Sequence, residues 1–134
     1  MTHIIPNMHF YGNCKQAVEL YKRAFGAEVK AIFLNSDADP ADYMAEENHK
    51  ELVYHSEIII GEQRLFLNDA TDGYRAGNQV SLLIHFDTVE ELKAAYEVIA
   101  EGAEILSPME STTYCAAFVS LLDKYGVQWE LMAG

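Results

Sequence analysis

Two segments of the chain have the hydrophobic spacing of an amphipathic helix. In residues 13–25 apolar side chains recur three and four positions apart, with charged side chains between them. Gly26 follows directly and is an expected C-terminal stop. The second segment begins at Thr88, which with Glu91 has the form of a capping box, and ends at Gly102. The sequence therefore predicts two helices of ordinary length.

Shorter runs with strand character surround these two helices. The expected strands are residues 4–11, 28–34, 52–60, 64–68, 80–86, 104–109, 115–122 and 127–132. Gly61 and Glu62 form an expected hairpin turn between two of them, and residues 123–126 separate the last two. The acidic residues 35–50 read as a loop with a turn of helix near 41–46.

The predicted elements occur twice in the same order. Strand, helix and three strands are followed by an expected linker at residues 69–79, and then by the same series again. The tripeptide Gly-Ala-Glu follows each helix, starting at Gly26 and at Gly102, so the offset is 102 − 26 = 76 residues. The sequence therefore predicts an α+β fold, with one domain over residues 1–134 made of two βαβββ modules at about 1–70 and 79–134.

Composition and charge exclude several classes of protein. A chain of 134 residues with 9 Lys and Arg against 21 Asp and Glu carries a formal net charge of −12, which disfavours nucleic acid and anionic membranes as partners. No segment approaches the roughly 20 apolar residues of a membrane span, and the first residues lack the pattern of a signal peptide, so the cytoplasm is the expected location. Cys14 and Cys115 lie far apart and predict two free thiols.

Three segments resemble one known group of proteins. They are PNMHFYGNCKQAVELY at residues 6–21, VYHSEI at 53–58 and LDKYGVQWEL at 122–131. With these segments the chain resembles the vicinal oxygen chelate superfamily, which includes glyoxalase I, bleomycin and fosfomycin resistance proteins and extradiol dioxygenases, and in particular its PhnB-like branch. The resemblance implies two modules whose curved mixed sheets enclose a cavity, helices on the outer face, and a homodimer. A cavity within one chain and a cavity between exchanged halves both agree with the sequence.

Metal-dependent members of the superfamily bind a divalent ion through four inward residues, usually two histidines and two glutamates. Carried over by position, these sites fall on Pro6, Phe66, Ser81 and Glu130. Only Glu130 is a ligand type, because proline and phenylalanine offer no donor atom and a serine hydroxyl is a poor replacement for imidazole. We therefore expect no cofactor and no metal at the usual site, and a divalent metal is disfavoured.

Strand alternation predicts which side chains face the cavity. The expected lining residues are Met8, Phe10, Phe66, Ser81, Leu83, His85, Tyr114 and Gln128. His9 is expected on the opposite face or near the rim. The candidate catalytic residues are Glu130, His55 and Glu57, since an apolar setting raises the pKa of a carboxyl and could make Glu57 or Glu130 a general base. The alternative is that His55 and Glu57 only hydrogen-bond each other or the next strand.

The expected function is binding of a small organic molecule in the cavity without the usual metal. The sequence agrees with an enzyme and with a binding protein alike. One alternative is a metal-dependent lyase or isomerase of the glyoxalase kind, with Glu130 joined by His85 or His55 as ligands. The other is a resistance protein that sequesters a drug, for which an acidic cavity would suit cationic, bleomycin-like ligands. Methyl transfer is disfavoured, because no glycine-rich nucleotide loop follows a strand.

Overall fold

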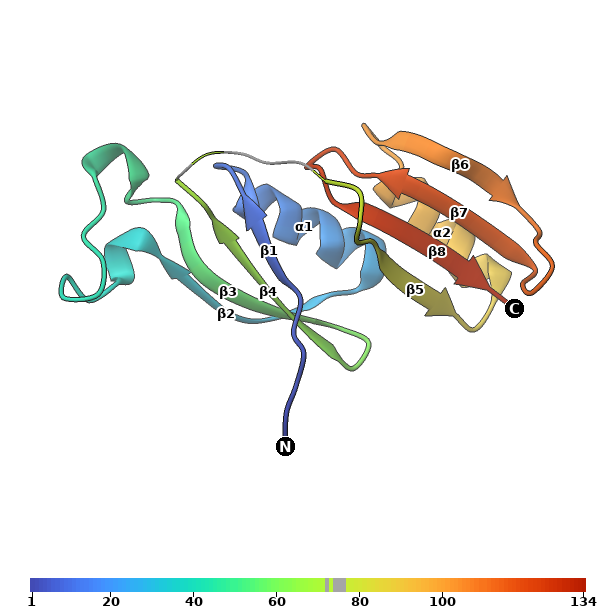
Figure 1. Ribbon diagram of the computed structural model, residues 1–134, viewed down its shortest axis with the longest axis horizontal. Coiled ribbons are helices and arrows are strands. Elements are labelled where there is room, and N and C mark those ends of the chain that lie inside the picture. Colours follow the sequence, from blue (N-terminus) through green and yellow to red (C-terminus); the bar gives the residue numbers. More distant parts are fainter. Residues whose placement is uncertain (72, 74–76) are drawn as a thin grey trace. The chain divides into compact units, whose positions relative to one another are not determined.

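The computed structural model describes residues 1–71, 73 and 77–134. By its internal contacts the chain divides into two compact units, Met1–Tyr74 and Arg75–Gly134. Each unit contains one four-stranded sheet and one α-helix that lies on one face of that sheet (Figure 1). The description of the chain as a single domain stays a prediction.

The first unit has the order strand, helix and three strands. Its elements are β1 (Asn7–Phe10), α1 (Cys14–Phe25), β2 (Glu28–Leu34), β3 (Val53–Ile60) and β4 (Gln63–Asp69). The strands lie side by side in the order β1-β4-β3-β2, with β1 parallel to β4 and the other neighbours antiparallel. The expected helical turn near 41–46 is wrong, because the connection from β2 to β3 has its 3₁₀ turns at Asn35–Asp37 and Glu47–His49.

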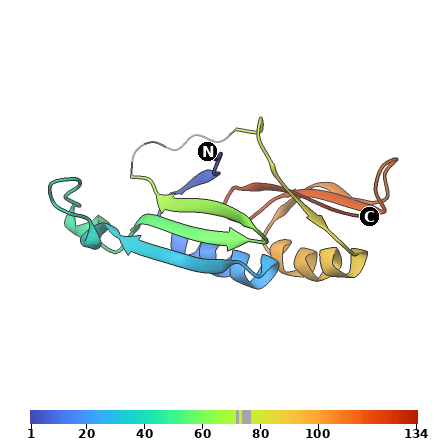
Figure 2. The ribbon, with the colours of Figure 1, turned by 90° about the horizontal axis from the view of Figure 1, so that it is seen from below.

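The second unit repeats this arrangement strand for strand. Its elements are β5 (Leu82–Phe86), α2 (Val89–Ile99), β6 (Glu104–Glu110), β7 (Ala117–Leu122) and β8 (Gln128–Ala133). The sheet order is β5-β8-β7-β6, and only the β5–β8 pair is parallel. In each unit the helix covers the same face of the equivalent sheet (Figure 2). The predicted α+β fold with two βαβββ modules is therefore confirmed.

The first strand and the helix of the two modules correspond at a constant offset of 76 residues. Asn7 pairs with Phe66 across β1 and β4, and Leu83, 76 positions after Asn7, pairs with Glu130 across β5 and β8. Gly26 and Gly102, at the same offset, both have positive φ angles of 66° and 73° after their helices. Glycine suits this left-handed conformation because it has no Cβ. The Gly-Ala-Glu repeat thus marks the same turn in both modules.

The hydrophobic core of each unit lies between its helix and its sheet. Fully buried side chains in the first unit include Phe10, Leu20, Tyr21, Ile58 and Leu67, and in the second Leu92, Ile99, Leu121, Trp129 and Leu131. The inner strands β4 and β8 alternate between such residues and more exposed ones, so one face of each sheet packs on its helix. Within the residues described, neither helix is long and apolar enough to span a membrane.

Asp69 ends β4 and anchors the start of α1. One oxygen of its carboxylate, Oδ1, accepts the backbone N–H groups of Gly12 and Cys14 at 2.8 and 3.0 Å, and Oδ2 accepts that of Val53 at 3.0 Å. Asn13 occupies the N-cap position, but its side chain makes no cap hydrogen bond. The prediction that Asp69 belongs to the linker is wrong, because its side chain is buried and replaces the missing cap. Residues 72 and 74–76 of that linker lie outside the described residues.

Candidate functional site

The candidate site is the face of each sheet that is turned away from its helix, which we call the distal face. On the first sheet, strand pairing fixes which residues share it. Ala31, Glu57, Phe66 and Asn7 are successive cross-strand partners on β2, β3, β4 and β1. Their neighbours along the strands, such as Leu65 and Leu67, are buried toward α1. Partners in a sheet lie on the same side, so this row of four crosses the distal face.

Glu57 is held by an arginine on the same face. The Arg64 guanidinium donates Nε to Oε2 of Glu57 at 3.1 Å and Nη2 to Oε1 at 3.2 Å. These hydrogen bonds to Arg64 keep the pKa of the Glu57 carboxyl below its usual value. The prediction that an apolar setting raises the proton affinity of Glu57 is wrong, because its dominant neighbour is a cation. Glu57 is therefore poorly suited to act as a general base.

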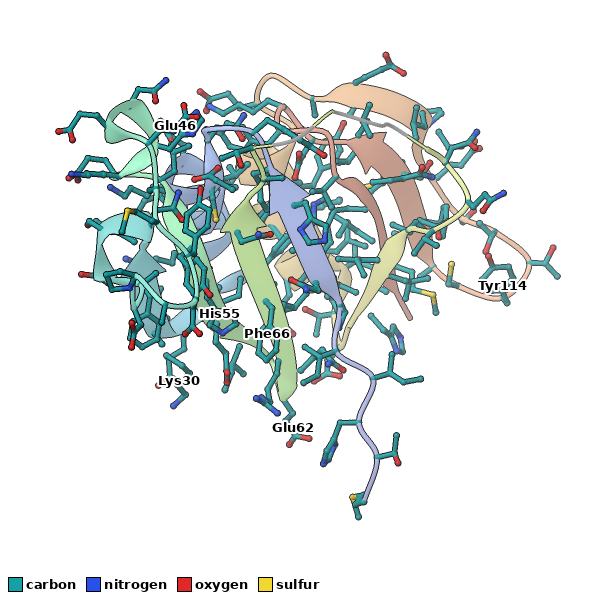
Figure 3. All side chains as sticks on the ribbon, turned by 60° about the vertical axis from the view of Figure 1, so that its left-hand side comes forward. Lys30, Glu46, His55, Glu62, Phe66 and Tyr114 are labelled. Atoms are coloured by element: carbon teal, nitrogen blue, oxygen red, sulfur yellow. The ribbon has the colours of Figure 1, made fainter. Side chains whose placement is uncertain are left out.

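Phe66 lies between two nitrogen-bearing side chains. The His55 ring meets it edge-on with the ring centroids 4.7 Å apart, and the Arg64 guanidinium carbon lies 5.4 Å from the Phe66 centroid. Figure 3 shows His55 and Phe66 next to each other on neighbouring strands, with Glu62 at the hairpin turn. Contacts of this kind fix the position of each ring. The distal face of the first sheet thus presents an aromatic ring with a basic group on either side.

The first strand has the opposite phase from the one predicted. Met8 pairs with Leu67 and Phe10 pairs with Asp69, so both lie on the helix side, and Phe10 is only 1% exposed. The predictions that Met8 and Phe10 share a face with Phe66 are wrong. A shift of one residue along a strand moves every side chain to the other face, which places His9 on the distal face instead.

The sequence interpretation missed His9 on this face, as it missed Arg64. Nδ1 of His9 lies 2.6 Å from Oδ1 of Asn68, its partner across β1 and β4. A signal was present in the sequence, because His9-Phe10 recurs as His85-Phe86 at the same offset of 76 residues as the Gly-Ala-Glu repeat. Since His85 was already placed inward, this repeat would have placed His9 there too.

The distal face of the second sheet carries the other candidate residues. Leu83 and His85 on β5 alternate with helix-side residues, and Glu130 pairs with Leu83 on one side and with Ser120 on the other. The Ser81 hydroxyl lies 2.5 Å from Oε1 of Glu130 and donates to it. Gln128 lies two positions before Glu130 and shares its face. The structure thus brings Ser81, Leu83, His85, Gln128 and Glu130 together on one face, as strand alternation predicts.

The donor atoms at the positions of the superfamily's metal do not form a metal-binding set. Phe66 has no donor, and the Ser81 hydroxyl is committed to Glu130. By the offset of 76, the first-strand position that corresponds to Ser81 is Ile5 and not Pro6, and isoleucine has no donor either. Across the described part of the chain, no three His, Cys, Asp or Glu side chains gather as metal ligands would.

The remaining candidates differ in exposure and reactivity. Tyr114 lies on the loop between β6 and β7 and is 68% exposed. Cys115 is buried, with its sulfur 3.0 Å from the hydroxyl of Thr112. Burial, with a smaller contribution from the Asp69 charge, raises the pKa of the Cys14 thiol from 9.0 to about 12. Cys14 is therefore a packing residue and not a nucleophile.

Comparison with known proteins places the chain in a family. Residues 2–132 match the family described as 3-demethylubiquinone-9 3-methyltransferase. The chain belongs to this family. It is 24% identical over 132 residues to protein YjdN of Escherichia coli K12, which covers 92% of this chain and 90% of YjdN. The predicted resemblance to the PhnB-like branch of the vicinal oxygen chelate superfamily is thereby confirmed.

Two solved structures show the same fold. The PhnB protein of Bacillus cereus superimposes with a TM-score of 0.83 over 99% of this chain and 100% of its own, at 24% sequence identity. The fosfomycin resistance protein FosX of Listeria monocytogenes superimposes with a TM-score of 0.65 over 100% of this chain and 94% of its own, at 15% identity. At these identities the likeness concerns the fold, and the chemistry must be argued from the residues of this chain.

Proposed function

We propose that the chain binds a small organic molecule on the distal face of its first sheet. The observation that carries this proposal is the fixed constellation on the first sheet, where Arg64 grips Glu57 through two hydrogen bonds and His55 meets Phe66 edge-on. Binding sites for small molecules combine an apolar or aromatic surface with a few polar groups held in place by their neighbours. None of these four residues belongs to the buried core between the sheet and its helix, so packing of the core does not explain their arrangement.

In this proposal each candidate residue has its own role. Phe66 offers a flat surface to an apolar or planar part of the ligand, and His55 offers a ring nitrogen beside it. Glu57 holds Arg64 in place and is not the base. The distal face of the second sheet has an acceptor of its own, because the Glu130 carboxylate, which accepts the Ser81 hydroxyl, can accept hydrogen bonds or a positive charge.

The proposal includes no divalent metal. Of the positions that correspond to the superfamily's ligands, Glu130 alone carries a side chain that commonly binds such ions, and one carboxylate leaves most of the coordination shell without protein donors. The donor set thus favours direct contacts between side chains and ligand. A glyoxalase-like activity would need metal ligands in addition to Glu130.

Removal of the Phe66 ring is expected to weaken ligand binding about tenfold, the effect of losing one well-packed aromatic contact. The test is a thermal-shift and calorimetry panel run in chelator, with fosfomycin, bleomycin, simple phenols and the hemithioacetal of methylglyoxal and glutathione. The variant is Phe66→Ala, compared with Tyr54→Ala, an aromatic residue of β3 whose ring stacks on Tyr43 and not on Phe66. Tyr54→Ala should bind within about twofold of the unaltered chain.

Three results of this panel would count against the proposal. They are the absence of any binder, equal binding by Phe66→Ala, and binding that appears only when a divalent metal replaces the chelator. The panel also separates the alternatives. Tight binding of bleomycin alone would favour drug sequestration, and metal-dependent turnover of the hemithioacetal would favour the lyase.

A homodimer is the expected assembly, because edge strands β2 and β6 carry exposed apolar side chains. Ile32 and Phe33 are 41% and 50% exposed, and Ile105 and Leu106 are 39% and 43% exposed. Edge strands with apolar residues are commonly covered by another chain. Sedimentation equilibrium at micromolar concentration should give about twice the chain mass of 15.1 kDa. A single species at the mass of one chain would contradict the expectation.

A further inference from the structure

The ring of His9 lies against the acceptor oxygen of a side-chain amide on the neighbouring strand. Its Nδ1 lies 2.6 Å from the amide oxygen Oδ1 of Asn68, and the two residues are direct partners on parallel strands β1 and β4. An amide oxygen has no hydrogen to give, so Nδ1 of His9 must carry the proton and donate it. In the neutral ring the other nitrogen, Nε2, then has a free lone pair.

The equivalent histidine of the second module lacks this arrangement. His85 lies 76 positions after His9, and its partner on β8 is Met132, whose thioether is only a weak acceptor. The two histidines therefore occupy the same place in equivalent sheets, but only the first has its proton assigned by a strong neighbour. Among the described residues, none hydrogen-bonds to Nε2 of His9.

The position of His9 relative to Phe66 limits which ligands could donate a hydrogen bond to Nε2 of His9. Asn7, the partner of Phe66, precedes His9 by two residues on β1 and shares its face. Two residues along a strand correspond to about 6.6 Å, which is close to the width of one six-membered ring with its substituent. A planar ring placed over Phe66 can therefore direct a substituent on its edge toward His9.

We propose that His9, positioned by Asn68, accepts the proton or hydrogen bond of an acidic hydroxyl group on a planar, ring-bearing ligand such as a phenol or cyclic enol. This inference rests on the proposed binding function and adds the class of ligand. When the hydroxyl is acidic enough, its O–H bond breaks and an N–H bond forms at Nε2. The electron pair stays on the ligand oxygen, and the resulting imidazolium keeps its Nδ1–H bond to Asn68. No oxidant, reductant or second reactant is required.

The first test concerns the tautomer and needs no ligand. Nitrogen NMR of the imidazole rings at neutral to mildly alkaline pH should show His9 as a single tautomer with the proton on Nδ1, and His85 as a mixture. Asn68→Leu should turn His9 into a mixture, and Asn68→Asp, which keeps an acceptor oxygen, should restore the Nδ1–H form. A His9 ring protonated on Nε2, or unchanged in Asn68→Leu, would overturn the positioning role of Asn68.

The second test uses two probes that differ in one hydrogen-bond donor. Para-nitrophenol carries an acidic hydroxyl, and in para-nitroanisole a methyl ether replaces it. We expect the phenol to bind about tenfold more tightly than the ether, the ratio that one good hydrogen bond supplies. His9→Phe should remove this preference while keeping a flat ring, and His49→Phe, the same exchange on the 3₁₀ turn Glu47–His49 outside the sheets, should retain it.

The outcomes separate this inference from the proposed function. Equal binding of the two probes, an equal loss of preference in His49→Phe, or no binding of either probe would overturn the role of His9. If other compounds of the panel still bind under those circumstances, the proposed function stands and only the ligand class is wrong. If no compound of any kind binds, the proposed function fails as well.

Discussion

Replacing Asp69 by alanine is expected to lower the free energy of unfolding by about 4 kcal/mol, because three backbone N–H groups lose their acceptor at once. The carboxylate accepts hydrogen bonds from the backbone N–H groups of Gly12 and Cys14 at the start of α1 and of Val53 at the start of β3. Asp69 is 6% exposed, so little water can replace it. Urea denaturation followed by circular dichroism measures the change.

Two other variants make the Asp69 result specific. Asp69→Asn keeps one acceptor oxygen but turns an NH₂ group toward a backbone N–H, so an intermediate loss of about 2 kcal/mol is expected. Asp37→Ala removes an exposed carboxylate that accepts a single N–H, from Leu34, and should change stability by less than about 1 kcal/mol. Equal effects of Asp69→Ala and Asp37→Ala would contradict the anchoring role of Asp69.

The Cys14 thiol is expected to react with alkylating reagents at least about a thousandfold more slowly in the folded chain than in the unfolded chain. Only the thiolate reacts, and a rise of the pKa from 9.0 to about 12 lowers the thiolate fraction about a thousandfold at any pH well below both values. Burial of the sulfur against solvent adds to this protection. The rate is measured with iodoacetamide by mass spectrometry, with and without urea.

The variant Cys115→Ala makes this measurement report on Cys14 alone. The folded protein should show a rate that rises with pH through the whole alkaline range, because its thiol still ionises above pH 9. The unfolded protein should reach its plateau above its ordinary pKa of 9.0. Rapid labelling of the folded chain at neutral pH would contradict the structure and would restore Cys14 as a candidate nucleophile.

Most of the fold could be predicted from hydrophobic spacing, because each module has one helix and strands that alternate clearly. In β8 the buried Trp129 and Leu131 alternate with Gln128 and Glu130, which is the pattern of a strand with one covered face. The repeated Gly-Ala-Glu marked the duplication, since a glycine with positive φ is needed after each helix. Strand alternation and the glycine after each helix depend on neighbouring residues only, so both can be recognised in the sequence.

The phase of β1 was mispredicted although the residues themselves carried the answer. The superfamily's metal position falls on Pro6, and strand alternation from Pro6 predicts that Met8 and Phe10 face inward. Their apolar side chains instead pack toward α1, and the polar Asn7 and His9 occupy the distal face. For a short strand such as β1, the apolar or polar character of the side chains predicts the buried face better than a position carried over from related proteins.

The interactions of Glu57 and Asp69 depend on residues that are distant in the sequence or lie on another strand. Glu57 meets Arg64 because the turn at Gly61 brings β4 back beside β3, and the resulting ion pair reverses the expected pKa shift. Asp69 meets Gly12 and Cys14 across 57 and 55 positions of chain. Such contacts become visible only after the sheet order is known.

Mapping the bound compound by NMR in the presence of chelator tests the central claim most directly. With the tightest binder of the panel, intermolecular contacts should appear at Phe66, His55 and other distal-face residues of the first sheet, and the affinity should not change when the chelator is added. Contacts confined to the outer surfaces of α1 and α2, or binding that disappears with the chelator, would contradict a metal-independent site on this distal face.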